Sequence, residues 1–190
     1  MKKIFIPLVL IVTCAACNNS GKSTVETADS INEAKLDTGL TRNDVVIDEA
    51  SSSFIVRVAN NGMTETQLAS MAEQKAVYAD VKSFAAMLYH DHSGLNQTVK
   101  DMAVTKNITL PAAITADKQR EIDQLNAKTG KDLDREFISM MITNHKASIE
   151  SFEKALTEVK DTDIRSLADK TLPTLRAHLD SAQQIQKRHW

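Results

Sequence analysis

Three long stretches of the sequence carry apolar residues at alternating steps of four and three positions. This spacing keeps one face of an α-helix turned inward. The three seams are Val81, Ala85, Leu88, His92, Leu95, Val99 and Met102; Ile138, Ile142, His145, Ile149, Phe152, Leu156 and Val159; and Ile164, Ala168, Thr171, Leu175, His178, Ala182 and Ile185. Such seams predict long helices packed side by side in an antiparallel bundle.

Glycine and proline divide the rest of the chain. A short helix is predicted to begin near Ile47 and to end at Asn60-Asn61-Gly62, where Gly62 suits a left-handed cap. The stretch over residues 64–106 is predicted to be one helix, or two helices joined near Gly94. Pro111 marks a break. A shorter helix is predicted at about residues 115–128, and two long helices at about residues 132–160 and 164–187. No stretch alternates as a strand does, so the predicted fold class is all-α.

Composition agrees with helices and argues against nucleic-acid binding. Hydrophobic residues make up 42% of the 190 residues but aromatic residues only 4%, which favours helices packed by aliphatic side chains. The formal net charge is −2, with acidic and basic residues interspersed. Nucleic-acid binding requires a clustered basic surface, so no nucleic acid is expected as a partner.

The first residues resemble a bacterial lipoprotein signal. Lys2 and Lys3 precede an apolar run over residues 4–12, and small residues lead to Cys17. Cys14 departs from the pattern, because leucine usually occupies that position. The division predicted from this resemblance is a signal peptide (1–16), a polar flexible tether (17–43) and a bundle domain (44–190). Lipidated Cys17 would then attach the protein to a membrane of the cell envelope, on the periplasmic side or at the outer membrane.

Each of the three seams contains one histidine near its middle: His92, His145 and His178. His145 and His178 lie equally far in sequence from the turn at Asp161–Thr162. In an antiparallel hairpin with equal rise per residue they should therefore face each other at one level. The height of His92 along the bundle cannot be predicted in this way, because Pro111 and a further helix interrupt the connection between its helix and the next long one.

Two interpretations of the three histidines remain open. Converging neutral imidazoles can hold a transition metal such as copper, zinc or iron. Asp91 could then act as a weaker ligand or as a hydrogen-bond acceptor, and the Met141 thioether could bind reduced copper. Glu65 and Glu73 are predicted to lie too many helical turns from His92 to join the site. Alternatively, the histidines form a buried polar layer that only fixes the register of the helices.

The segments "FAAMLYHDH" (84–92) and "FISMMITNH" (137–145) share Phe, Met and His at identical spacing. This internal repeat has a period of 53 residues. It suggests two related helical hairpins with both histidines pointing at the bundle axis.

The motifs "VKSFAAMLYHDH", "NITLP", "FISMMITNHKASIESFEKA" and "LADKTLPTLRAHLDSAQ" resemble the domain-of-unknown-function 4142 (DUF4142) family over residues 53–186. The resemblance implies a ferritin-like four-helix bundle with short additional helices, in an envelope protein with no established reaction. "MMITNHKAS" is also similar to a neighbouring family with a Met-x-x-His-His pattern, some of whose members handle copper; Asn144 replaces the first histidine here.

No Ser-His-Asp arrangement, glycine-rich phosphate loop or Glu-x-x-His pair suggests catalysis. The sequence therefore favours a lipid-anchored, non-catalytic bundle, and two functions are kept for it. It binds a transition metal in the envelope, or it is a structural and interaction module that contacts envelope proteins.

Overall fold

The computed structural model describes residues 22–37 and 47–190, and every regular element in these ranges is an α-helix. In chain order the helices are α1 (Thr24–Asp37), α2 (Glu49–Lys75), α3 (Ala79–Thr105), α4 (Ala116–Asn126), α5 (Gly130–Glu158) and α6 (Thr162–His189). The predicted all-α fold is confirmed. The predicted signal peptide and two parts of the predicted tether, residues 17–21 (with Cys17) and residues 38–43, lie outside the described residues.

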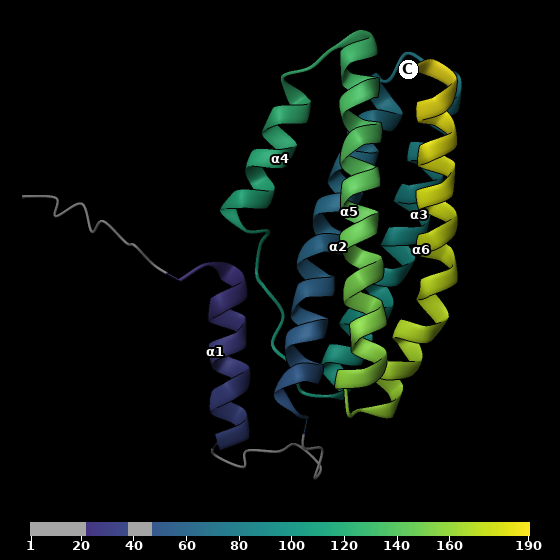
Figure 1. Cartoon of the computed structure of the whole chain (residues 1–190). Helices are drawn as coiled ribbons and strands as arrows, with labels where there is room; N and C mark the ends of the chain where they lie inside the picture. The colour runs from purple at the N-terminus through teal and green to yellow at the C-terminus, as the bar shows by residue number, and fades with distance from the viewer. Residues whose placement is uncertain (1–21, 38–46) are drawn as a thin grey trace, which may run out of the picture.

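The four long helices form two antiparallel hairpins, α2–α3 and α5–α6, that stand side by side (Figure 1). The hairpins meet where α2 contacts α5 and where α3 contacts α6. The two remaining helices lie outside this bundle, α4 against α2 and α5, and α1 against α2. None of the helices in residues 22–37 and 47–190 combines the length and the hydropathy needed to cross a bilayer.

The predicted seams face the interior: each of their residues is buried or half-buried. In α6 the neighbouring Leu172 is buried more deeply than the predicted Thr171. The apolar core has two parts. One part lies toward the α5–α6 turn and includes Phe54, Val99, Phe152 and Leu175. The other lies toward the α2–α3 turn and includes Leu68, Leu88, Phe137 and Ala182. Between them is a layer of four buried polar residues, Glu65, His92, His145 and His178.

The prediction that the first core helix ends at Asn60-Asn61-Gly62 is wrong, because α2 continues through these residues to Lys75. Gly62 serves a close approach between helices rather than a cap. A Cβ atom placed on Gly62 would collide with Oδ1 of Asn96 on α3. The Asn96 side chain is held against α2 by a hydrogen bond from its Nδ2 to Thr66 Oγ1, 3.0 Å.

The predicted helix over residues 64–106 is divided, but not at Gly94. α2 ends at Lys75 and α3 begins at Ala79, while Gly94 lies inside α3. A residue distant in sequence fixes this turn. The buried Asp134 carboxylate on α5 accepts hydrogen bonds from the backbone N–H groups of Val77 (3.0 Å) and Tyr78 (2.8 Å). These donors would otherwise be unpaired at the start of α3.

The flexible tether predicted for residues 17–43 is wrong for residues 24–37, which form α1. Asn32 anchors this helix to the connection between α3 and α4. Its amide accepts from the Thr109 N–H (2.7 Å) and donates to the Thr109 carbonyl (3.0 Å). Lys35 Nζ also donates to the Asn107 carbonyl, 2.8 Å.

The sequence repeat relates two diagonal helices that run in the same direction, α3 and α5 (Figure 1). Its matching residues meet across the core. The Phe84 and Phe137 rings are 6.3 Å apart between centroids, and the His92 and His145 rings 5.5 Å. However, α3 is the second helix of its hairpin and α5 the first of its own. The sequence suggested that the repeat relates one hairpin to the other. This prediction is wrong, because the matching helices occupy different places in their hairpins.

Candidate metal centre

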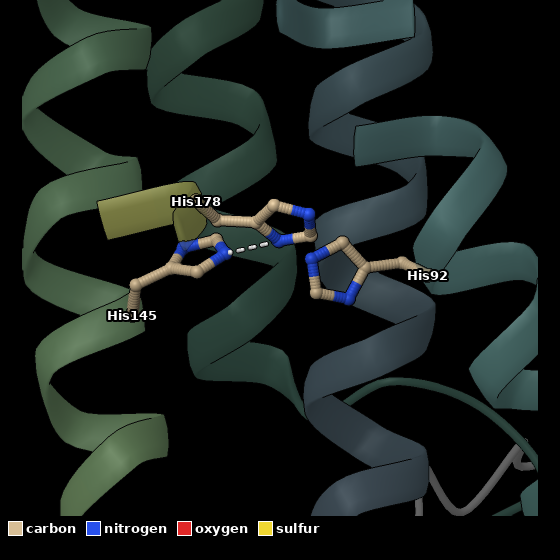
Figure 2. Close-up of side chains that lie close together, drawn as sticks. All are labelled: His92, His145 and His178. Atoms are coloured by element: carbon tan, nitrogen blue, oxygen red, sulfur yellow. Dashed lines mark hydrogen bonds between the residues drawn. The ribbon is translucent and has the colours of Figure 1, made fainter. Parts of the chain in front are cut away.

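Helices α3, α5 and α6 bring His92, His145 and His178 together inside the bundle, where their exposed fractions are 3%, 0% and 3%. The ring centroids are 5.5 Å apart for His92–His145, 5.5 Å for His92–His178 and 5.3 Å for His145–His178. One nitrogen of each ring lies within 4.8 Å of the other two (Figure 2). The predicted convergence of the three histidines is confirmed.

The prediction that His145 and His178 face each other at one level is also confirmed. Nε2 of His145 lies 3.3 Å from Nδ1 of His178. The turn between α5 and α6 sets this level, because Asp161 caps α6 by accepting from the N–H groups of Asp163 and Ile164, both 3.0 Å. Equal helical rise on both sides of the turn then places the two rings opposite each other.

Hydrogen bonds to the outer nitrogens define which ring nitrogens carry protons. His145 Nδ1 lies 2.9 Å from the Met141 carbonyl, which can only accept, so Nδ1 carries the proton and Nε2 has a lone pair. His178 Nε2 lies 3.1 Å from Asp91 Oδ2. The hydrogen bond from His90, followed by that from His178, lowers the pKa of Asp91, so the carboxylate is ionised and accepts. In neutral His178, Nδ1 then has the lone pair.

Two lone pairs consequently face each other across 3.3 Å in the core. This arrangement is repulsive unless an electrophile lies between the two nitrogens. A proton can fill this role, but it converts one ring to a buried imidazolium. A metal ion can fill it too. Two nitrogens bound about 2.0–2.1 Å from a tetrahedral ion are about 3.3–3.4 Å apart, which matches this pair.

His92 supplies a third nitrogen. Its Nε2 is buried and has no hydrogen-bond partner among the described residues. Figure 2 shows the ring nitrogen farther from the Cβ atom turned toward His145 and His178. Burial, reinforced by the nearby His178, lowers the pKa of His92 to about 4. Burial also lowers the pKa of His145. Both rings are therefore neutral at neutral pH, as metal ligands must be.

Glu65 belongs to this layer, contrary to the prediction that it lies too far from His92. Its Oε2 is 3.2 Å from His92 Nε2, although the two groups are not aligned as a hydrogen bond. Burial raises the pKa of this carboxyl group. The prediction failed because it treated residues 64–106 as a nearly continuous rod. The turn at residues 76–78 folds α2 back along α3, and it depends on Asp134, which local sequence does not reveal.

Asp91 and Met141, the two weaker candidate ligands, contact the histidines through hydrogen bonds. Asp91 accepts from His178 Nε2, as an orienting group behind a ligand does. Met141 contributes its backbone carbonyl to His145, while its side chain belongs to the apolar core near Leu133 and Phe137.

These features define the class: an all-α bundle with three buried, converging histidines on separate helices. The chain belongs to the family described as "Domain of unknown function (DUF4142)", whose profile matches residues 41–185. The family assignment rests on the sequence match and agrees with the resemblance noted above.

Solved structures show the same fold. A DUF305 fragment from Deinococcus radiodurans is 15% identical, with a TM-score of 0.67 over 75% of this chain and 98% of that chain. CopM in its Cu(II)-bound form is 20% identical, with a TM-score of 0.65 over 74% of this chain and 97% of that chain. CopM in its Cu(I)-bound form is 21% identical, with a TM-score of 0.64 over the same shares. No curated protein matches the chain.

Proposed function

We propose that this protein binds a single copper ion through His92, His145 and His178. The observation that carries the proposal is the convergence of three buried ring nitrogens, two of which are left with facing lone pairs by the bonds of their rings to Met141 and Asp91. Ring nitrogens that converge in this way are suited to hold a cation between them. Glu65 adds a carboxyl group beside His92.

Copper is preferred over zinc and iron for two reasons. Imidazole nitrogen binds all three metals, but Cu²⁺ forms the most stable complexes among the divalent ions of this series. In addition, the similarly folded CopM has been solved in Cu(II)-bound, Cu(I)-bound and Ag-bound forms. The identity between CopM and this chain supports only a shared fold. The proposal that this chain binds copper therefore rests on its own three histidines.

We further propose that the protein works at the cell envelope, held by a lipid on Cys17. The basic, apolar and small-residue order of residues 1–17 supports this location. A copper site on a tethered bundle would sequester the ion outside the cytoplasm. Fractionation tests the location: the protein should sediment with membranes, and Cys17→Ser should release it. If the wild type and Cys17→Ser fractionate alike, the proposed lipid anchor on Cys17 is wrong.

Metal analysis of the purified protein tests the centre. After incubation with excess Cu²⁺ and removal of loosely bound ions, one ion per chain is expected. The variant His145→Ala should lose stoichiometric binding, because it removes the most deeply buried of the three ligands. Lys146→Ala is the matched control, since it changes an exposed residue at the next position of α5. Equal copper content in His145→Ala and Lys146→Ala would reject the centre.

The second candidate is a structural layer, and the continuous chain of contacts from the Met141 carbonyl through His145 and His178 to Asp91 favours it. In that role a proton joins the two rings and the layer fixes helix register. The two functions differ in one measurement. A structural layer leaves purified wild-type protein without copper, yet replacing the histidines by leucine still impairs packing, seen as lost dispersion in NMR spectra.

A further inference from the structure

A pocket of about 320 Å³ opens between α3 and α6 and reaches the histidine centre from the side. Its lining includes His92 and His178, which are buried, together with the exposed His90, Gly94 and Lys170. A further pocket, about 390 Å³ between α2 and α5, is lined by none of the three histidines. Two of the three proposed ligands therefore line the α3–α6 pocket.

Asp91 joins the outer and inner histidines of this pocket. Its Oδ1 lies 3.0 Å from Nδ1 of His90, and its Oδ2 lies 3.1 Å from Nε2 of His178. The His90 side chain is 88% exposed. Because Nδ1 donates to the carboxylate, the neutral ring keeps a lone pair on Nε2. The pocket therefore has a nitrogen ligand at its rim and an ionised carboxylate one step further in.

We propose that the α3–α6 pocket is the port through which copper reaches and leaves the buried centre, with His90 as the capturing ligand at its rim. The proposal rests on the copper centre described above. The ligands themselves are at most 3% exposed, so without a port the ion could exchange only when helices separate. Such opening is rare in the core of a bundle. Capture by His90 at the rim, followed by passage through the α3–α6 pocket, avoids it.

Gly94 allows the port to be closed without disturbing the core. It lines the pocket, and a Cβ atom placed there meets nothing within 4 Å. A leucine side chain at this position would fill the pocket, whereas alanine would leave it open. Gly94→Leu and Gly94→Ala are therefore a matched pair that shares the change in helix propensity.

The test follows the transfer of Cu²⁺ from a weak chromogenic chelator to the full protein, recorded as a rate and as the final amount bound. Gly94→Leu should take up copper about tenfold more slowly than Gly94→Ala, because exchange then requires local opening. The final amount should be equal in both. His90→Ala should also slow uptake and leave the final amount unchanged, because the three inner ligands remain.

Lys170 provides a test in the opposite direction. Its positive charge at the rim opposes an approaching cation. Lys170→Glu should speed uptake about threefold at low salt, and the gain should shrink as added salt screens the charge.

The outcomes separate the two proposals. Slower uptake in Gly94→Leu with an unchanged final amount supports the port. Equal rates for Gly94→Leu and Gly94→Ala overturn the port and leave the copper centre standing. Wild-type protein that takes up no Cu²⁺ overturns the centre, and the port with it.

Discussion

His92 and His145 lie between two apolar parts of the core, where a positive charge loses most of its hydration. This environment lowers the pKa of both rings. A surface histidine is partly protonated near neutral pH and must lose that proton before it binds a metal. The buried pair is already neutral, so binding to it competes with protons only at acidic pH.

The same burial makes the apo protein sensitive to acid. The folded-state pKa of His92 is about 4, below its ordinary value of 6.5, so the unfolded chain takes up the proton first as pH falls. Stability is then fully present above pH 6.5 and declines toward pH 4. The loss attributable to His92 between pH 7 and pH 4.5 should be about 2 kcal/mol of unfolding free energy. Urea unfolding of wild type and His92→Leu at both pH values measures it. Parallel losses in the two proteins would contradict this origin.

Part of the site could be predicted from single residues and their spacing. His145 and His178 are related by a short turn, so counting helical rise was enough to place them at one level. His92 is reached only through α4 and two loops, and its helix position had to be inferred from its seam. Glu65 could not be placed at all, because its approach to His92 follows from a turn that Asp134 fixes from another helix.

At the scale of the elements, glycine had two roles that local sequence does not distinguish. Gly62 and Gly94 both lie inside helices, and both were predicted to mark a helix end or joint. Gly62 permits the close contact with Asn96 that brings α2 and α3 together, while Gly94 faces open space. The helix seams were predictable because each is a local repeat. The break between α2 and α3 was not, because it depends on a tertiary contact.

Alanine substitution should separate these roles. Gly94→Ala should stabilise the protein by about 0.5–1 kcal/mol, because alanine costs less backbone entropy in a helix. Gly62→Ala should instead destabilise it by about 1–3 kcal/mol, since the added methyl group collides with Asn96. The double variant Gly62→Ala/Asn96→Ala should recover most of the loss. Thermal and urea unfolding measure all three, and a stabilised Gly62→Ala would show that the helices do not approach closely there.

At the scale of the whole molecule, the polar layer joins the two hairpins. His92 comes from the α2–α3 hairpin, and His145 and His178 come from the α5–α6 hairpin. The apolar contacts above and below the layer would hold the hairpins together without it, but they specify the relative level of the hairpins less strictly. An ion bound to all three rings would fix that level. Metal binding should therefore be coupled to unfolding of the entire bundle rather than to one local segment.

This coupling has a measurable size. An ion that binds only the folded protein stabilises it by about 2.7 kcal/mol when its free concentration is 100 times Kd. Copper should therefore raise the melting temperature of the wild type in proportion to the logarithm of its concentration. The variant His92→Ala removes the imidazole that the first hairpin contributes and leaves two histidines on the second, so its shift should be much smaller. Lys146→Ala should retain the wild-type shift. If His92→Ala responds as the wild type does, His92 is not a ligand and does not join the two halves of the bundle through the ion.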